Sequence, residues 1–347
     1  MIWVAWRFQR TVLCALALLA LVIIAFTIVS GSVQHHDLSE FMHAPCRGMQ
    51  IATPGRGDLC GQLAVKLDNA ATFNPYIRVA GLVIAPLLGV MLGVLAVASE
   101  VERRTVRLAW SQSISRTRWF AAKVGVGAFF VVIILVPTAF VMSWWNGAIG
   151  STDLFGRSTY VIAGWDLVAW GLFMFALTLL LGAAIRHVGW TLAAATLVFL
   201  AVAVTFPSTV RQHLVAPTVQ WSQPSDKTQG NSLVYGESDS PAFIPANAWI
   251  FFSGIALRST VGIPTYAQMN AIDPKVYGCI NRYPHKTQSD INSATDKCYK
   301  KFDVENVVVY IPANQFWTLQ LREGLIYLSA GIVFAGGALV LIRRIEP

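Results

Sequence analysis

The chain has 347 residues, of which 55% are hydrophobic and only 13% are charged, and it carries a net charge of +8. In soluble domains about a quarter of the residues are charged, so this composition excludes an ordinary soluble globular protein. The mean hydropathy of +0.55 indicates a membrane protein.

Six apolar segments are long enough to cross a bilayer, which takes about 20 residues in a helix. The first segment follows Arg7 and Arg10 as a secretory signal core would, but it is longer than such a core and lacks a good cleavage site. We therefore expect an uncleaved helix there. The predicted spans are residues 11–30, 79–99, 124–145, 162–185, 188–206 and 324–342.

The positions of Lys and Arg orient these spans, because short cytoplasmic loops retain basic residues. With both termini inside, the inner segments carry the whole net charge of +8 and the outer segments sum to zero. Topology thus accounts for the pI of about 9.4, and we expect no nucleic-acid partner. The predicted fold class is a mainly α membrane protein with six transmembrane helices and both termini inside.

A long outer segment separates the fifth and sixth spans and is large enough for a small domain. Its strand-like run Val307–Ile311 indicates that this extracellular domain has a mixed fold. The predicted division is residues 1–206 for the first five spans, with an extracellular loop at 31–78 and a cytoplasmic loop at 100–123, then residues 207–321 for the extracellular domain and residues 322–347 for the sixth span and a cytoplasmic tail.

Four of the five cysteines fall in segments assigned to the outside, where disulfides form and persist. Four cysteines allow three pairings, and sequence alone does not choose among them. We favour the pairing that closes the shortest loops, which joins Cys46 to Cys60 and Cys279 to Cys298. A zinc site is the alternative, although its spacing is not a recognised ligand pattern, and it would combine Cys46 with His35, His36 or His43.

Few residues within the predicted spans stand out. Gly89 and Gly93 form a G-x-x-x-G pattern, which either lets two helices approach closely or reflects the abundance of small residues in membrane helices. Asp166 and Glu323 fall near predicted outer ends, where water or headgroups reach them, so they are candidates for gating or for an interfacial role. No ionisable residue lies deep within a predicted span, where proton- or ion-driven carriers usually need one.

The sequence contains no G-x-x-x-x-G-K-S/T phosphate loop and no catalytic motif. The glycine-rich run Gly55–Gly61 falls in an outer segment and lacks the lysine. We therefore expect no catalytic centre, cofactor or metal in this chain.

The cytoplasmic loop Glu100–Lys123 carries six basic and two acidic residues between two apolar spans. Its run Thr105–Trp110 places apolar side chains beside arginines. This pattern fits a short helix that lies along the membrane surface and docks against something below it.

These loop residues resemble the permease subunits of type-2 ABC exporters, in particular a bacterial group with a single permease. That family carries a Glu-x-Glu-x-Gly-Thr motif, then a Leu, a Ser-Arg and a Lys. The matching residues are Glu100, Glu102, Thr105, Leu108, Ser115, Arg116 and Lys123. Arg104 departs from the pattern, since it stands where the family usually has Gly.

Three further stretches are similar to the same family and come in the same order. "MIWVAWRFQR" resembles its N-terminal interfacial segment, and "LGAAIRH" (181–187) resembles its turn between the fourth and fifth spans. "YIPANQFWTLQLREGLIYL" (310–328) resembles the start of its sixth span, where the family also has a Gln and a Glu. Gln320 therefore joins Asp166 and Glu323 as a candidate gating or interfacial residue.

The resemblance implies a homodimer in a bacterial plasma membrane, together with two ATP-binding subunits that hold ATP and Mg. In this family the loop forms a coupling helix that seats in a groove of the ATP-binding subunit. The residues expected to carry coupling are Glu100, Glu102, Thr105, Arg107, Leu108 and Arg116.

The family also implies a pathway lined by the second and fifth spans, which carry almost no charge in this chain. The expected cargo is therefore hydrophobic or amphipathic, such as a drug, an antibiotic, a lipid or a lipopeptide, and drug cargo would place the protein in multidrug resistance. The alternative is a complex that moves no cargo and transmits ATP-driven motion to the extracellular domain, as a sensor. A carrier without an ATPase is disfavoured, because the spans lack buried charges.

Overall fold

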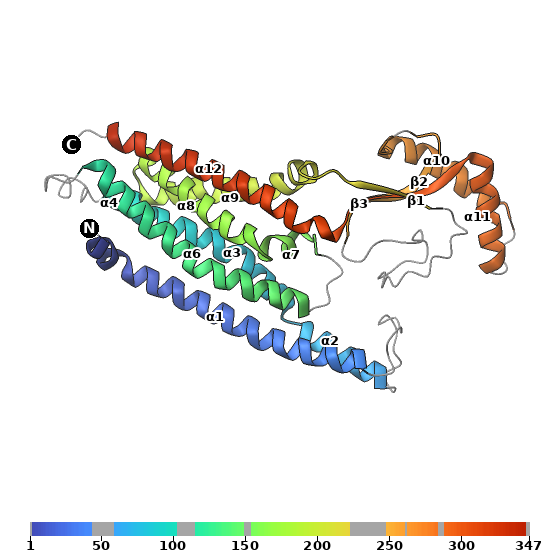
Figure 1. The fold of residues 1–347 in the computed structure, drawn as a ribbon, viewed down its shortest axis with the longest axis horizontal. Helices are drawn as coiled ribbons and strands as arrows, with labels where there is room; N and C mark the ends of the chain where they lie inside the picture. Colours follow the sequence, from blue (N-terminus) through green and yellow to red (C-terminus); the bar gives the residue numbers. More distant parts are fainter. Residues whose placement is uncertain are drawn as a thin grey trace. The chain divides into compact units, whose positions relative to one another are not determined.

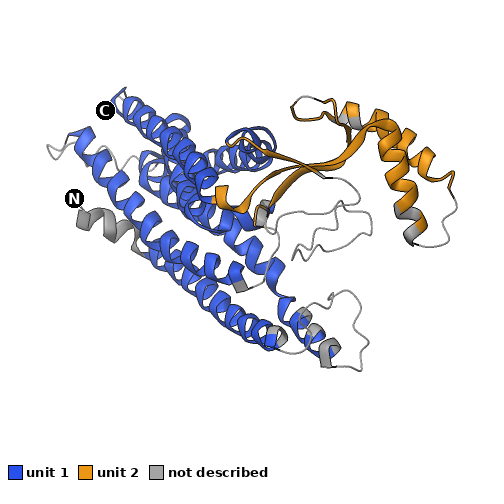
Figure 2. Ribbon diagram, turned by 45° about the vertical axis from the view of Figure 1, so that its right-hand side comes forward, with its two compact units in different colours: residues 1–151, 156–214, 317–347 blue, residues 152–155, 215–316 orange. Residues whose placement is uncertain are grey.

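The structure is a computed structural model, and it describes residues 2–43, 59–102, 115–148, 154–222, 248–260, 262–283 and 288–344. The chain forms two compact units, which Figure 2 distinguishes by colour. The helical unit comprises residues 1–151, 156–214 and 317–347, and the inserted unit comprises residues 152–155 and 215–316.

Within the described residues, six helical segments are long and apolar enough to cross a membrane, and they follow the order of the six predicted spans. They are Thr11–Glu40, Val65–Glu102, Arg116–Gly147, Trp165–Ile185, Val188–His213 and Ala313–Arg344. The elements that form the helical unit (Figure 1) are α1 (Ile2–His43), α2 (Leu59–Ala71), α3 (Asn74–Gly93), the π-helix η1 (Val94–Ala98), α4 (Ser99–Glu102), α6 (Arg116–Ala148), α7 (Arg157–Ile162), α8 (Trp165–Ile185), α9 (Val188–Thr209), η2 (Arg211–His213) and α12 (Phe316–Arg344).

The segment 31–78, which the sequence predicts as a loop, is helical in much of its described part, because α1 and α2 extend into it. Hydropathy marks where the apolar run stops, whereas the helices continue with polar side chains that bond to one another. Gln34 Nε2 donates to Asn74 Oδ1 at 2.8 Å, and Lys66 Nζ lies 3.1 Å from Asp37 Oδ1. Contacts between helices, which no hydropathy scan detects, therefore lengthen these elements.

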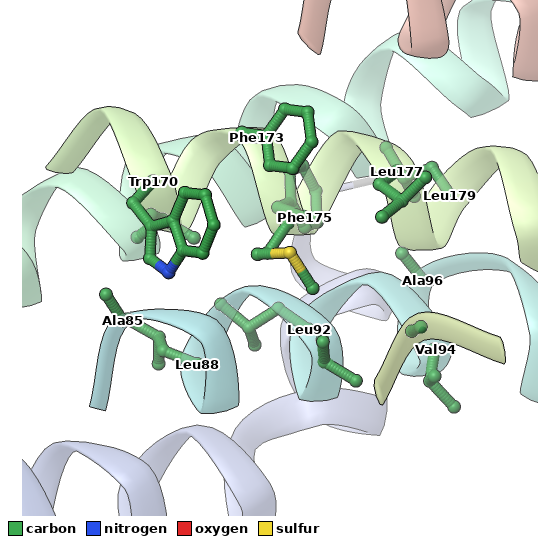
Figure 3. Packing of buried hydrophobic residues seen from close by; sticks show 14 of the residues in the cluster. Ala85, Leu88, Leu92, Val94, Ala96, Trp170, Phe173, Phe175, Leu177 and Leu179 are labelled. Carbon is green, nitrogen blue, oxygen red and sulfur yellow. The ribbon is translucent and has the colours of Figure 1, made fainter. Parts of the chain in front are cut away.

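The core of the helical unit is built around α8, which packs against α3, α6 and α9. In the apolar window of α8, 67% of the residues are buried, compared with 11% in α9. Helix α8 is thus the central helix, while α9 leaves most of its surface available to lipid or to another chain. Figure 3 shows the close packing of α8 on α3 and η1, with labelled residues Ala85, Leu88, Leu92, Val94, Ala96, Trp170, Phe173, Phe175, Leu177 and Leu179.

The G-x-x-x-G pattern of α3 faces α8 within the same chain. A Cβ atom placed on Gly93 would lie 2.7 Å from Cβ of Thr178, and one on Gly89 would collide with the carbonyl oxygen of Gly171. Real Cβ atoms do not approach other atoms so closely, so only glycine permits this contact. The pattern therefore marks a close helix–helix contact rather than a chance abundance of small residues.

The inserted unit contains an antiparallel sheet of three strands in the order β1-β3-β2, and two helices accompany it. The predicted strand-like run Val307–Ile311 forms most of β3. Alternate residues of β3 enter different apolar clusters, since Val304 packs with Ile255 and Val276, whereas Val307 packs with Phe252. The elements are β1 (Thr218–Ser222), β2 (Trp249–Leu257), α10 (Tyr266–Ile280), α11 (Gln288–Phe302) and β3 (Val304–Ile311).

A disulfide between Cys279 and Cys298 joins α10 to α11. This is one of the two bridges in the favoured local pairing. The other bridge, from Cys46 to Cys60, involves Cys46, which lies outside the described residues. Cys14 in α1 is a free, exposed thiol.

Candidate functional site

The predicted coupling segment begins and ends in helices that the structure describes. Glu100 and Glu102 lie in α4, directly after the π-helix η1, and Arg116 is the first residue of α6. π-Helical turns are rare and occur frequently at functional sites. The three expected coupling residues between these helices lie outside the described residues, and they are Thr105, Arg107 and Leu108.

Two of the coupling residues cap the ends of other helices. Glu102 Oε2 accepts a hydrogen bond of 2.6 Å from the backbone N–H of Val188, the first residue of α9. The first amides of a helix have no partner within the helix, and the helix dipole favours a negative charge there. At the other side, Arg116 Nη1 donates to the carbonyl oxygen of Arg343 at 2.8 Å, in the last turn of α12. These two contacts join the segment to the ends of α9 and α12.

An ion pair between Glu100 and Lys123 adds a third link, which ties α4 to α6. The two side chains are 16% and 8% exposed, so water screens this pair only partly. We name Glu100, Glu102, Arg116 and Lys123 the helix-end cluster. The cluster joins α4 to the start of α9 and α6 to the end of α12, and it ties α4 to α6.

A second set of polar residues is buried where α7, α8, η2 and α12 meet. Its charged members are Asp166, Arg211 and Glu323, and each is at most 3% exposed. Ionisable groups inside a membrane protein are costly and generally functional. We name the set the polar cluster, with members Tyr160, Asp166, Arg211, Gln320, Glu323 and Tyr327.

The centre of the polar cluster is a bidentate ion pair. Arg211 Nε and Nη2 donate to the two carboxylate oxygens of Glu323, each at 2.8 Å. Tyr327, one turn further along α12, donates to Glu323 Oε1 at 3.2 Å. The guanidinium also lies 4.1 Å from the ring centre of Tyr160. Charge, geometry and a π-face thus all hold Arg211 in place.

Tyr160 lies in the short helix α7, outside the membrane-length helices. Burial raises the pKa of its phenol, and the nearby carboxylates of Asp166 and Glu323 raise it further, while Arg211 opposes them. The phenol is therefore protonated at physiological pH. Its ring supports the guanidinium as a neutral group.

Gln320 fastens the first turns of α12 to the connection between α7 and α8. Its Nε2 donates to the carbonyl oxygens of Tyr160, at 3.0 Å, and of Ala163, and its Oε1 accepts from the backbone N–H of Trp165 at 2.9 Å. Gly164, between Ala163 and Trp165, has a φ of +90°, and a Cβ atom there would collide with Gln320 Oε1. Glycine is needed at this position for both reasons.

Asp166 and Glu323 correct the expectation that water or headgroups reach them, since each is only 1% exposed. Their positions near helix ends indicated access to water, but the side chains turn inward among α7, α8 and α12. From the described residues, neither carboxylate oxygen of Asp166 accepts a hydrogen bond of ordinary geometry. Glu323, Arg211 and Tyr160 lie within its electrostatic reach.

Arg211 is not among the candidate residues that the sequence indicates, because it follows the apolar run of the fifth span and falls in the predicted extracellular domain. A signal was present in the sequence. One basic residue lies just after the fifth span and one acidic residue just before the sixth, at the same predicted depth. Opposite charges at matching depth favour an ion pair between adjacent helices.

Metal binding is not a feature of the described residues, among which no three His, Cys, Asp or Glu side chains group closely enough to hold an ion. The zinc alternative depends on Cys46, which is not among them. Both clusters offer ion pairs and helix caps. These contacts join the ends of helices to one another.

The family comparison covers the part of the chain that contains most of these features. A family model described as "ABC-2 membrane transporter related" matches residues 15–211, which is more than half of the chain. The chain belongs to this family. No curated protein and no solved structure matches it.

The matched region of this ABC-2-related protein begins in α1 and ends at Arg211, so it includes the helix-end cluster except for the bonded end of α12. Membership, together with six membrane-length helices, makes the chain a multi-pass membrane protein. It supports a permease subunit of an ABC transporter. An ABC-2 permease implies a separate ATP-binding partner.

Proposed function

We propose that this protein is the membrane-spanning permease of an ATP-driven exporter in a bacterial plasma membrane. It works as a homodimer with two copies of an ATP-binding subunit, and residues 100–123 are the coupling segment. The observation that carries the proposal is the helix-end cluster. A push on one short segment would move the ends of α4, α6, α9 and α12 together, because Glu102 and Arg116 cap helices distant in sequence.

Hydrophobic or amphipathic cargo is part of this proposal. Helix α9 leaves apolar side chains exposed along its length, including Leu197, Leu200 and Val204. Helix α3 exposes Val79 and Val83 near its start. In a homodimer these faces would line a pathway without charge, which suits a drug, an antibiotic, a lipid or a lipopeptide.

The test is co-purification with the ATP-binding subunit, followed by assays of ATP hydrolysis and of transport in vesicles. Leu108→Asp should leave membrane insertion intact while transport falls by an order of magnitude or more, because a buried charge would spoil an apolar docking contact. Glu40→Ala is the control, since Glu40 is an exposed carboxylate in α1, outside the coupling segment. Unchanged transport in Leu108→Asp would remove the coupling role from this segment.

A second candidate function is transmission of ATP-driven motion to the inserted unit without cargo. The observation that favours it lies at the two chain connections to that unit. Arg322 Nη1 donates to the carbonyl oxygen of Leu214, and Arg211 pairs with Glu323, so the helix ends flanking the inserted unit are tied to each other. A transmitter would hydrolyse ATP in sealed vesicles without accumulating any hydrophobic test compound, whereas an exporter would accumulate at least one.

A further inference from the structure

The polar cluster presents two carboxylates to one guanidinium. Both carboxylate oxygens of Glu323, on α12, accept hydrogen bonds from Arg211. Asp166, on α8, lies beside Glu323, since its Oδ1 is 3.9 Å from the position of a Cβ atom placed on the adjacent Gly324. Among the described residues neither of its oxygens accepts a hydrogen bond of ordinary geometry, and Arg211 and the phenol of Tyr160 interact with it electrostatically. Both carboxylates are 1% exposed. The structure therefore contains one carboxylate that Arg211 bonds and a second one nearby that it does not bond.

We propose that Arg211 exchanges between these two acceptors, so that the cluster is a two-position switch. In the position seen here, the end of α9 is joined to α12 through Glu323. In the other position, Arg211 pairs with Asp166, and the end of α9 is joined to α8 instead.

The physical reason is the cost of an unpaired charge. Separating the end of α9 from α12 would leave Arg211 without a partner in a buried site, which is strongly unfavourable. A second carboxylate on the neighbouring helix removes this cost, because the guanidinium stays paired throughout the movement. Arginine has more N–H donors than the two bonds to Glu323 use, so it is able to begin the second contact before it breaks the first.

The surroundings favour two discrete positions over a continuous drift. Tyr327 donates to Glu323 from one turn along the same helix, so Glu323 keeps this hydrogen bond after Arg211 leaves. Gln320 fixes the connection that precedes Asp166, through its bonds to Ala163 and Trp165. Glu323 is thus held by its own helix and the start of α8 before Asp166 is held by Gln320 of α12, so both acceptors stay in place while the cation moves between them.

In the exporter proposed above, the exchange would let the outer end of α9 move away from α12 during each cycle. This use of the switch rests on the proposed function. The exchange itself does not, because it concerns a contact within one chain. The experiment therefore has one readout that needs no ATP-binding subunit and another that does.

The first readout is a double-mutant cycle on the full chain in lipid nanodiscs, with the apparent melting temperature as the measurement. Glu323→Gln should lower it modestly, since Asp166 takes over the cation. Asp166→Asn should leave it unchanged or raise it, because Arg211 is bonded to Glu323 here and neither oxygen of Asp166 accepts a hydrogen bond of ordinary geometry. The double variant should lose clearly more than the sum of the two single changes. Additive changes would overturn the proposal.

The control repeats the cycle with Glu40→Gln in place of Glu323→Gln. Glu40 pairs with Lys66 in an exposed position, so its variant should be additive with Asp166→Asn.

If the double variant of the polar cluster does not fold, Arg211→Lys in the wild-type and Asp166→Asn backgrounds replaces it. A lysine makes only a point contact and depends more on a second carboxylate, so an equal loss in both backgrounds would also contradict the exchange.

The second readout is turnover of the complex with its ATP-binding subunit. Asp166→Asn should reduce transport by an order of magnitude while the melting temperature is maintained, because only the second position needs Asp166. Full transport by this variant would overturn the exchange. If the wild-type complex showed no transport and no hydrolysis, the proposed function would fail while the result of the melting cycle stood.

Discussion

The helix-end cluster and the polar cluster use the same kinds of side chain in opposite surroundings. At the helix-end cluster, Glu102 is exposed and bonds to a helix terminus, and only the pair of Glu100 and Lys123 is largely shielded. At the polar cluster, Arg211 and Glu323 are 3% and 1% exposed and are joined by two hydrogen bonds, one to each carboxylate oxygen. Exposed charges cost little to rearrange, whereas buried ones hold their helices until a substitute partner is available. The first arrangement suits docking of another subunit, and the second suits a switch.

The sharpest way to test the contrast is to remove the buried cation. Arg211→Ala leaves two buried carboxylates without a counter-charge, so it should lower the free energy of unfolding by about 3 to 5 kcal/mol. Thermal unfolding in nanodiscs measures the effect. A loss no greater than that of an exposed arginine, such as Arg258→Ala in the inserted unit, would show that the pair is not sealed from water.

Gly164→Ala should disturb the polar cluster through its backbone. The substitution strains a residue at φ +90° and pushes against Gln320, so it should cost about 1 to 3 kcal/mol more than strain alone. Gly262→Ala measures the strain by itself, because Gly262 has a φ of +89° and open space where the Cβ would stand. Equal melting temperatures for the two variants would contradict the tight contact with Gln320.

Glu102→Ala tests the helix-end cluster, where the charge is exposed. Loss of this cap should cost at most about 1 kcal/mol of stability, because a carboxylate at an exposed helix N-terminus contributes little. Its effect on transport should be larger than its effect on stability, since α9 is one of the helices that the proposed coupling segment would move. Glu102→Gln, which retains an oxygen acceptor, separates the hydrogen bond from the charge. A stability loss as large as that of Arg211→Ala would erase the distinction between the clusters.

The smallest effect is expected at the pair of Glu40 and Lys66, whose side chains are 47% and 50% exposed. Glu40→Gln should produce no measurable change in melting temperature at physiological salt, because water and ions screen the pair. The same measurement at low ionic strength should reveal a slight loss. A salt-independent loss would mean that this part of α1 is shielded by another chain.

Predictions from the sequence were strongest for the spans and weakest for the partners of polar residues. The six spans were found because hydropathy is a local property of about 20 residues. The helical continuation of α1 past residue 30 was not predicted, since it depends on Gln34 meeting Asn74, which lies 40 positions away. The glycine pair in α3 left two interpretations open, and the packing of Gly93 on Thr178 decided between them.

For the candidate site, the sequence likewise indicated residues but not the partners that they bond. The sequence singled out Glu102, Arg116, Gln320 and Glu323 by their resemblance to a family, but it named no partner for any of them. The partners that tie them to other helices are Val188, Arg343, Trp165 and Arg211, and each lies 86 residues or more away along the chain. Arg211 was assigned to the extracellular domain, because its neighbours in sequence are loop-like. Long-range pairing is a property of the folded chain, and a residue-by-residue pattern does not record it.

Composition and hydropathy by themselves determined that this protein is a six-span membrane protein, because the cost of exposing polar groups to lipid acts on every segment independently. The tertiary structure alone decided which charges are buried, which helix lies at the centre and which acceptor holds Arg211. Those outcomes depend on how helices distant in sequence pack, since burial and hydrogen bonding are set jointly by all the helices around a residue.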